Sequence, residues 1–365
     1  MEIRIDRAEF LTELAPMQGI VERKSTIAVL SHLLLNARGD RLHLAATDLD
    51  VSLTSWCQAD VEREGGIAVQ ARKFMEIIRS LSGEEVRLRI DEGRDLTITA
   101  GSSRFKIHGL APEDFPTLPV LEAEVEVKLP FADLRSMIGK VLFAVSADES
   151  RFQLNGALLK LKSEAFELVA TDGHRLAVVE QGLEGSTDED SVMVPRKALQ
   201  ELQRFDGQGT ATFRRSEHHL SFGIERRELI CRILEGTFPD YERVIARDQD
   251  KKVVFDRKYL LDSVQRVALL SGDRARGVRF QLSSGQLVIS AANPDLGEAS
   301  ETLACDYEGE GCHIGVNPDY LSQFLGAVDT QQVRLELKDA DSQCVGYPVD
   351  GSEKRYLCVI MPMRL

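Results

Sequence analysis

The sequence has 365 residues, of which 28% are charged and 43% hydrophobic, and its formal net charge is −14 at pH 7. No apolar run is long enough for a membrane-spanning helix, and the first residues alternate charged and apolar side chains, unlike a secretory signal. The six cysteines form neither a CxxC pair nor a metal-ligand pattern with histidine. We therefore expect a cytoplasmic protein with reduced thiols and no bound metal.

The predicted elements repeat in chain order. An apolar stripe at three- and four-residue spacing starts near Phe10, again near Leu134 and again near Leu260, which predicts three amphipathic helices. Runs such as Val333–Leu337 alternate polar and apolar residues, as strands with one wet face do. A second short helix is predicted in each part of the chain, over residues 73–81, 197–205 and 319–325. The pattern predicts an α+β module with two helices that is repeated three times along the chain.

Landmarks inside the modules keep one spacing. Phe115-Pro116, Phe238-Pro239 and Met361-Pro362 follow one another at intervals of 123 residues, and Thr47-Asp48 precedes Thr171-Asp172 by 124. A fixed internal period outweighs any single motif, and about 120 residues is a usual domain size. We expect three similar domains, over residues 1–122, 123–248 and 249–365.

Catalytic constellations are weak. The carboxylates in Thr47–Asp50 could serve acid-base or metal chemistry, but Asp after a strand more commonly caps backbone N–H groups in a turn. Thr171–Arg175 holds no nucleophile in a recognisable elbow, and no phosphate-binding glycine loop is present. We expect no catalysis and no cofactor. A metal-dependent enzyme that uses Asp48, Asp50 and His174 remains the alternative at this stage.

The charge distribution leaves room for a nucleic-acid partner. An acidic chain ordinarily argues against one, but Ala71–Arg79, Arg196–Arg204 and Arg257–Arg266 each carry three basic residues and one acidic residue. A few basic helices on an acidic body suit loose contact with DNA phosphates. Ordinary solvated helix faces explain the same charges equally well.

Seven short motifs extend from one end of the chain to the other: Gln18–Lys24, Ala46–Asp50, Phe115-Pro116, Leu154–Gly156, Ala170–Leu176, Phe238–Tyr241 and Val359–Leu365. Together they resemble the family of bacterial DNA polymerase III beta subunits, the sliding clamps. The resemblance implies three clamp domains per chain, each with two helices packed on antiparallel sheets, in a ring-shaped head-to-tail dimer. Such a ring encircles duplex DNA and tethers the polymerase without catalysis of its own.

The resemblance also implies three sets of site residues. A pocket for a short Gln-Leu-x-Leu-Phe-like peptide is expected at Leu154, Thr171, Gly173, His174, Arg175, Leu176, Pro239, Arg243, Val244, Val359, Met361, Pro362 and Met363. Contacts with DNA phosphates are expected at Lys24, Arg72, Lys73, Arg79, Arg151, Arg196, Lys197, Arg204 and Arg266. A dimer interface is expected between Arg104, Phe105 and Ile107 of the first domain and Leu269, Leu270, Glu298 and Glu301 of the third.

The implied partners are double-stranded DNA bound without sequence preference, a second copy of the chain, the replicative polymerase, the clamp loader and repair polymerases. No membrane partner is expected. Cys344–Arg355 looks longer than the family's usual final hairpin, and we expect it to reshape one wall of the pocket. Without the resemblance, Met361 and Met363 fit equally well as core residues of a last strand, and Leu269-Leu270 as helix core.

Size bears on the number of chains in such a ring. A domain of this length approximates a sphere roughly 35 Å across. Three such spheres in a ring leave a hole of about 5 Å, whereas six leave roughly 35 Å, enough for a duplex about 20 Å wide. Encirclement therefore needs two chains. A monomeric peptide-binding scaffold that is not linked to DNA is the alternative function.

Overall fold

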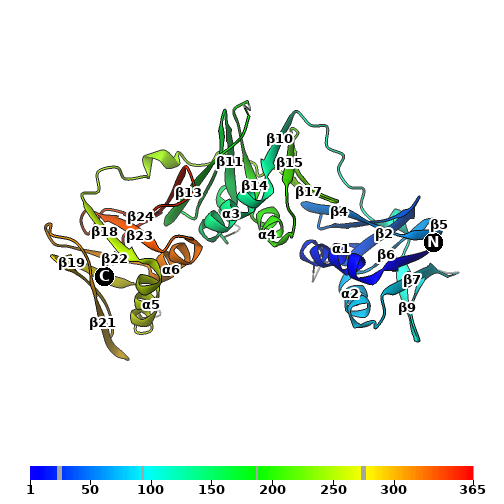
Figure 1. Ribbon diagram of the computed structural model, residues 1–365, viewed down its shortest axis with the longest axis horizontal. Helices are drawn as coiled ribbons and strands as arrows, with labels where there is room; N and C mark the ends of the chain where they lie inside the picture. The colour runs from blue at the N-terminus through cyan, green and yellow to red at the C-terminus, as the bar shows by residue number, and fades with distance from the viewer. Residues whose placement is uncertain (23–26, 92–93, 149, 186–187, 273–276, 365) are drawn as a thin grey trace. The chain divides into compact units, whose positions relative to one another are not determined.

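The computed structural model describes residues 1–22, 27–91, 94–148, 150–185, 188–272 and 277–364. The chain divides into two compact units, which have separate sheets (Figure 1). Unit 1 holds residues 1–134 and 197–233, and unit 2 holds residues 135–196 and 234–365.

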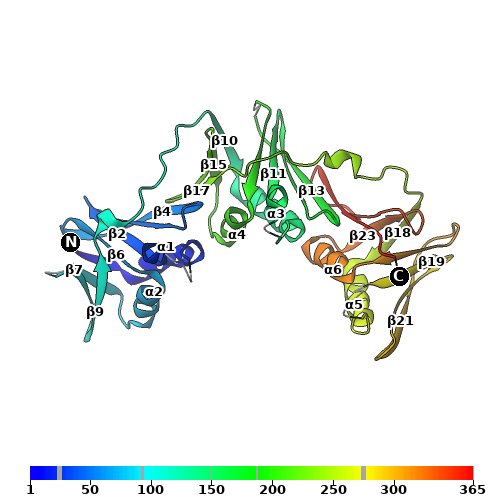
Figure 2. The ribbon, with the colours of Figure 1, turned by 180° about the vertical axis from the view of Figure 1, so that it is seen from behind.

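Unit 1 is built on one antiparallel sheet, which has 13 strands among the described residues. In spatial order the strands are β10 (Val125–Pro130), β15 (Thr210–Arg215), β16 (His219–Ile224), β17 (Arg227–Arg232), β4 (Val51–Gln58), β3 (Arg41–Thr47), β2 (His32–Arg38), β6 (Gly65–Gln70), β9 (Ser103–Leu110), β8 (Asp95–Ala100), β7 (Glu85–Ile90), β1 (Glu2–Asp6) and β5 (Asp60–Arg63). Helices α1 (Arg7–Ile20) and α2 (Ala71–Ser80) lie side by side (Figures 1 and 2).

Unit 2 has two antiparallel sheets in the part of the chain that the structure describes. The larger sheet runs β14 (Asp190–Pro195), β11 (Gly156–Lys162), β12 (Ala165–Thr171), β13 (Arg175–Gly182), β25 (Arg355–Ile360), β24 (Cys344–Pro348), β23 (Gln332–Leu337) and β18 (Lys251–Asp256). The smaller runs β21 (Gly297–Ala304), β20 (Gln286–Asn293), β19 (Val278–Ser283) and β22 (Cys312–Val316). Helices α5 (Arg257–Ala268) and α6 (Pro318–Ala327) pack against each other.

The remaining helices lie where the chain passes between the units. The unit division falls inside α3 (Phe131–Val141) and after the first residue of α4 (Arg196–Arg204). Within the described ranges, all six α-helices occur where apolar stripes or short helical segments were predicted, so the α+β prediction is confirmed. Strand pairing continues across both expected domain boundaries, because β17 pairs with β4 in unit 1 and β25 pairs with β13 in unit 2.

The helices of the two units start and stop by the same local chemistry. Asp6 caps α1 by accepting a hydrogen bond from the Glu9 amide at 2.8 Å, and Asp256 caps α5 through the Tyr259 amide at 2.8 Å. The next residue is arginine in both, and Arg257 donates to the Leu325 and Thr330 carbonyls beyond it. In unit 1 the corresponding arginine, Arg7, donates to the Ile78 and Arg79 carbonyls at the end of α2. Each side chain thus donates to a carbonyl in the last turn of the neighbouring helix, and Arg257 also reaches the Thr330 carbonyl beyond the end of α6.

A second repeated feature is the turn after the third strand of each module. Asp48 Oδ1 accepts hydrogen bonds from the Asp50 and Val51 amides, and Asp172 Oδ1 accepts them from the His174 and Arg175 amides. In the third copy Asn293 Oδ1 accepts from the Asp295 amide. These side chains close the turn by bonding to the backbone that follows them. The prediction that Asp48 has this turn-forming role is confirmed.

Candidate functional site

Unit 2 contains a partly open, mostly apolar hollow of about 190 Å³, called here the unit 2 pocket. Its wall comes from the 3₁₀ turns Phe152–Leu154 and Tyr241–Arg243, the β12–β13 turn, and the end of β25 with the residue after it. The lining residues are Leu154, Thr171, Gly173, Arg175, Leu176, Pro239, Tyr241, Val244, Val359 and Met361. A small number of polar groups in an apolar hollow is typical of a ligand site.

The β12–β13 turn forms one side of the pocket. The Thr171 hydroxyl donates to the Arg175 carbonyl at 2.6 Å and accepts from the Gly173 amide at 3.1 Å. Gly173 has φ +86°, a conformation that side chains with a Cβ rarely adopt. The Met361 amide donates to the His174 carbonyl at 2.9 Å, so the chain end is fastened to this turn.

Arg175 fixes the base of the turn. Its guanidinium bonds to Asp172 and Gln323 and to the carbonyl of Phe143, and it lies 4.3 Å from the centre of the Tyr320 ring. The residue is only 8% exposed, and the carboxylate of Asp172 neutralises its charge inside the protein. Arg175 therefore lines the pocket and also holds the β12–β13 turn in place.

Nine of the thirteen residues predicted for the pocket line it, and the other four lie outside its lining. Arg243 is 86% exposed and pairs with Asp240 at 2.7 Å. His174 points its ring toward Tyr320, with 6.4 Å between ring centres. The Met363 amide, next to Pro362, bonds to the Gly315 carbonyl of β22 at 2.8 Å. Cys344–Arg355 contributes no lining residue.

Tyr241 was missed as a pocket residue by the sequence reading. Tyr241 lines the pocket, and its hydroxyl bonds to Glu167, which does not line it. The motif Phe238–Tyr241 could have indicated it, because it holds a tyrosine close to the predicted pocket residue Pro239. A tyrosine can contribute its ring to an apolar surface and its hydroxyl to a hydrogen bond elsewhere.

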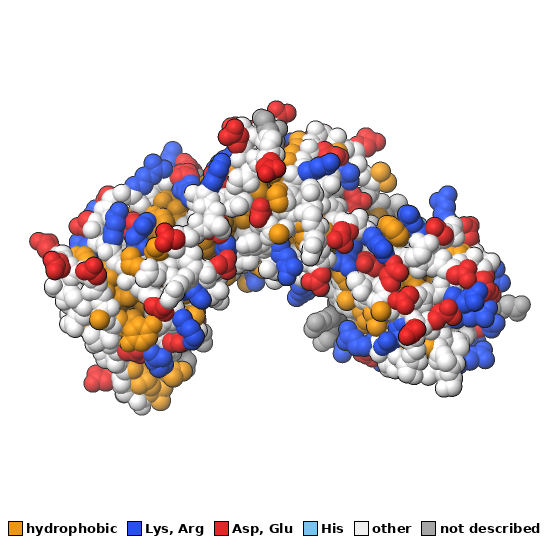
Figure 3. Space-filling model, viewed as in Figure 1, with side chains coloured by type: hydrophobic (Ala, Val, Ile, Leu, Met, Phe, Trp, Pro, Cys, Tyr) orange, Lys and Arg blue, Asp and Glu red, His pale blue; other side chains and the backbone are white. Residues whose placement is uncertain are grey.

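The residues predicted to contact DNA differ in how freely their charges are presented. Lys24 lies outside the described residues. Arg72 and Lys73 share Glu76, Arg204 pairs with Glu201, and Arg79 is exposed at the end of α2. Others are tied to the protein: Lys197 bonds to Asp48 and to the Ile20 carbonyl, Arg196 to the Ser146 carbonyl, Arg151 to the Asp172 carbonyl, and Arg266 to Glu301. On the face in Figure 3, basic and acidic side chains are mixed over both units.

The residues predicted for the dimer interface lie on or beside two strands with an open edge. From Ser103 to His108, β9 pairs with β8, and it meets β6 only at Gly109 and Leu110. Among the residues that the structure describes, strand β21, with Glu298 and Glu301, pairs only with β20. Phe105 on β9 is 37% exposed and Leu269 after α5 is 78% exposed. Glu301 bonds to Arg266 and Ser263 of its own chain, so it is already partnered.

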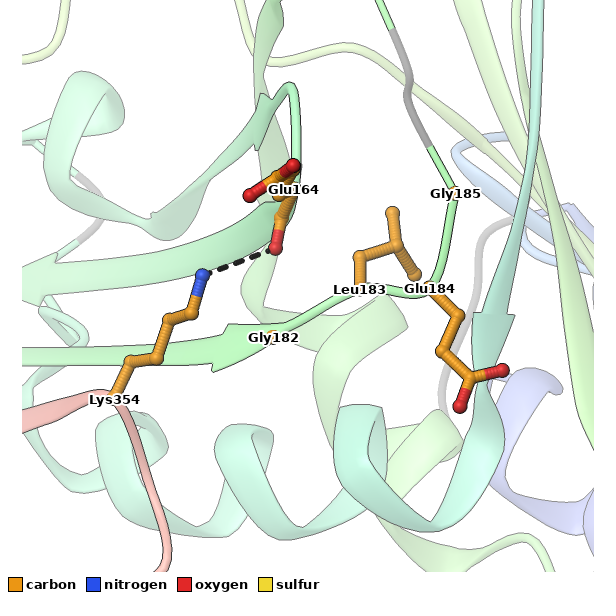
Figure 4. Close-up of a pocket in the computed structure, with 6 residues that line it drawn as sticks. All are labelled: Glu164, Gly182, Leu183, Glu184, Gly185 and Lys354. Carbon is orange, nitrogen blue, oxygen red and sulfur yellow. Dashed lines mark hydrogen bonds between the residues drawn. The ribbon is translucent and has the colours of Figure 1, made fainter.

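Other features offer little chemistry. Figure 4 shows a shallow, open depression in unit 2, where Lys354 Nζ donates to the Glu164 carbonyl at 3.2 Å beside Gly182 and Glu184. No cluster of three potential metal ligands occurs among the described residues. Within the same residues, none of the helices is long and apolar enough to cross a membrane.

Comparison with known proteins identifies the family. Models of the N-terminal, central and C-terminal domains of the DNA polymerase III beta subunit match residues 1–119, 128–240 and 242–364. The chain belongs to the DNA polymerase III beta subunit family. It is 38% identical to the beta sliding clamp of Pseudomonas putida over 370 residues, with both chains covered completely.

Solved structures show the same fold. The sliding clamp of Pseudomonas aeruginosa bound to griselimycin superposes with a TM-score of 0.95 at 37% identity over all of both chains. The Caulobacter crescentus clamp, with polyethylene glycol bound to a putative beta-motif tethering region, gives 0.92 at 34% identity, also over all of both chains. The chain therefore has the three-domain clamp fold and the sliding-clamp function in DNA replication, that of a non-catalytic processivity factor.

Proposed function

We propose that two copies of the chain close head to tail into a ring around duplex DNA in the cytoplasm. Each copy would contribute three domains, over residues 1–122, 123–248 and 249–365. The three family-model matches and the 123- and 124-residue intervals support this division. The ring holds DNA by topology, so the chain needs only loose and sequence-independent contacts with phosphates.

The open strand edges support the head-to-tail contact. An unpaired edge with exposed apolar side chains invites pairing with another chain. Strand β9 presents Arg104, Phe105 and Ile107, and the region around β21 presents Leu269, Leu270 and Glu298. Pairing of β9 of one copy with β21 of the next would give the unpaired backbone groups of both strands hydrogen-bond partners. It would also bring basic residues next to acidic ones. Glu301 would contribute to the interface as part of its ion pair with Arg266 of the same chain.

The residues proposed to contact DNA are those predicted from the sequence. Arg72, Lys73, Arg79 and Arg204 present the most exposed charges of the set. Lys24, Arg151, Arg196, Lys197 and Arg266 complete it. Because ion pairs within the chain already occupy several of these side chains, each contact with a phosphate is weak, as a moving clamp requires.

Partner peptides are proposed to bind in the unit 2 pocket, and the presence of this pocket is the main observation that supports the proposal. The pocket's apolar lining fits the leucine and phenylalanine side chains of a Gln-Leu-x-Leu-Phe-like segment. The proposed set also includes His174, Arg243, Pro362 and Met363, which lie outside the lining and would contact the peptide beyond it. Met361 is flexible and can repack around different partners. The replicative polymerase, the clamp loader and repair polymerases would compete for this pocket. The tethering region named for the Caulobacter clamp agrees with this role.

Peptide binding tests the pocket directly. A fluorescently labelled Gln-Leu-x-Leu-Phe-like peptide should bind the intact protein, and Met361→Ala should weaken binding about 5- to 10-fold by removing apolar contact area. Val254→Ala is the matched control, since Val254 is a partly exposed apolar residue of β18 outside the pocket. Equal affinities for the two variants would remove the pocket from the proposal.

A further inference from the structure

Tyr241 connects the unit 2 pocket to a buried carboxylate. The Tyr241 hydroxyl donates to Glu167 Oε1 at 2.5 Å, and Glu167 on β12 is 0% exposed. Glu167 itself is not among the residues that line the pocket. Tyr241 therefore lines the pocket, while its hydroxyl is bonded to a carboxylate that does not line it.

Glu167 belongs to a row of charged residues that crosses four strands. The register places Lys160 of β11 opposite Glu167, Glu167 opposite Glu180 of β13, and Glu180 opposite Arg355 of β25. Lys162 bonds to Glu167 Oε2 at 3.1 Å and also to Glu180. A buried carboxylate is costly unless cations and donors surround it, and this one has both. We call Lys160, Glu167, Glu180 and Arg355 the charged row.

The charged row holds the pocket wall at two neighbouring residues. Tyr241 bonds to Glu167 of β12, and the next residue, Glu242, bonds to Arg355 of β25 at 2.7 and 3.3 Å. Lys160 Nζ lies 3.3 Å from the Tyr241 hydroxyl. Pro239, Tyr241 and Val244 of this irregular segment line the pocket. The segment lacks strand partners over these residues, so side-chain bonds and the apolar packing of Tyr241 and Ile245 hold its position.

The equivalent place in unit 1 lacks this arrangement. The residues 124 positions before Lys160, Glu167 and Glu180 are Asn36, His43 and Trp56, which stand in the same cross-strand register. The residue 123 positions before Tyr241 is Leu118, which has no hydroxyl and packs on an apolar cluster. The shared backbone therefore does not require a charged row or a tyrosine. Their presence beside the pocket points to a role in the pocket.

We propose that Tyr241 is a positioning residue for peptide binding, and that the charged row holds residues 238–246 in the peptide-ready arrangement before a peptide arrives. The inference rests on the proposed peptide-binding function of the pocket. A wall that is ordered in advance spares the peptide the entropy cost of ordering it, and this raises affinity. Arg355, the last residue of the long Cys344–Arg355 segment, thus acts on the pocket wall through Glu242 without lining the pocket.

Tyr241→Phe tests the role of the hydroxyl, because it keeps the ring in the pocket and removes one oxygen. We expect the Kd for the labelled peptide to rise about 5- to 10-fold, which is part of the effect of one lost hydrogen bond to a charged acceptor, because the loss loosens the wall and removes no contact with the peptide. Backbone amides at 238–246 should exchange hydrogen faster in the free variant, and peptide saturation should reduce that difference. Glu242→Gln should give the same two changes with smaller size.

Tyr347→Phe is the matched control. Tyr347 packs on the same apolar cluster as Tyr241 but does not line the pocket, and its variant should keep the wild-type Kd within about twofold. Unchanged affinity and exchange in Tyr241→Phe, with the wild type binding normally, would overturn the inference alone. Weaker binding without faster exchange would also overturn it, since the hydroxyl would then act on the peptide itself. A wild type that binds no peptide would remove the proposed function and the inference together.

Discussion

Gly19 and Gly326 are the penultimate residues of α1 and α6, yet their surroundings differ. A Cβ on Gly19 would overlap the carboxylate of Glu201, whereas a Cβ on Gly326 would meet open space. Glu201 is itself buried and bonds to Arg204 at 2.6 Å, so it has little freedom to move away. The same residue type at the same helix position therefore serves packing in one unit and not in the other.

Gly19→Ala should destabilise the protein by about 1–3 kcal/mol, the usual cost of overpacking. Gly326→Ala should have no such cost and should stabilise by up to about 1 kcal/mol, because alanine is the better helix former. Denaturant unfolding of both variants measures the two effects. Equal changes in the two variants would show that Glu201 moves without cost.

The charge of Glu201 should make stability depend on pH. Burial raises the pKa of this carboxyl above its ordinary value of 4.5, with smaller opposing effects from Arg204 and Lys197. The folded protein then holds the proton more tightly than the unfolded chain, so wild-type stability falls as pH rises from 4.5 through the folded-state pKa. Each unit of raised pKa corresponds to about 1.4 kcal/mol.

Glu201→Gln removes this titration and keeps an oxygen for Arg204. The unfolding free energy of the variant, relative to wild type, should therefore increase as pH rises above 4.5 and level off above the folded-state pKa of Glu201. Parallel denaturant titrations across this range measure the difference. A difference that stays constant or decreases with pH would contradict the buried-carboxylate account.

Single side chains were the part of the site that the sequence predicted least completely. Leu154, Thr171 and Leu176 were predicted for the pocket and line the hollow in unit 2, because they fall in motifs that the family shares. Tyr241 was not, because pocket membership in an irregular segment depends on which way a ring points. Lys197 was expected to be available to DNA, yet it bonds to Asp48 and the Ile20 carbonyl. Sequence spacing does not reveal such pairs between distant residues.

At the scale of elements, Arg257 and Lys258 offer a direct comparison. They are adjacent cations at the start of α5, but Arg257 donates to the Leu325 and Thr330 carbonyls while Lys258 forms an exposed pair with Asp262. Arg257→Met should cost about 2 kcal/mol, because carbonyls at the end of α6 lose a charged donor. Lys258→Met should change stability by less than about 0.5 kcal/mol. Thermal unfolding separates them, and equal losses would contradict a capping role for Arg257.

The elements themselves were largely predictable. Apolar spacing located α1, α3 and α5, and alternation located strands such as β23, because both patterns are local. Strand partners were not predictable, since they join distant residues: Cys231 of β17 pairs with Val51 of β4, 180 positions earlier. Continuous pairing of this kind explains why the compact units do not follow the three repeats. A repeat can be recognised by its period while its strands pair with the next repeat.

For the whole molecule, the open edges predict the assembly. Leu269→Asp places a charge at an exposed apolar position of the proposed interface, and sedimentation should shift from dimer toward monomer at micromolar concentration. Val254→Asp, at an exposed position of β18 that is not part of the proposed interface, should remain dimeric. Helical content should be unchanged in both variants, as measured by circular dichroism. A dimer that survives Leu269→Asp and instead fails with Val254→Asp would place the interface elsewhere.

Retention on DNA of defined topology tests the central claim most directly. The protein is assembled onto nicked circular DNA with a clamp loader and passed through a gel-filtration column, and the same DNA is then linearised and passed again. A closed ring of two chains predicts retention on the circle and loss from the linear form, because a threaded ring leaves only over an end. Equal retention on both forms would show that adhesion holds the protein, and would contradict encirclement.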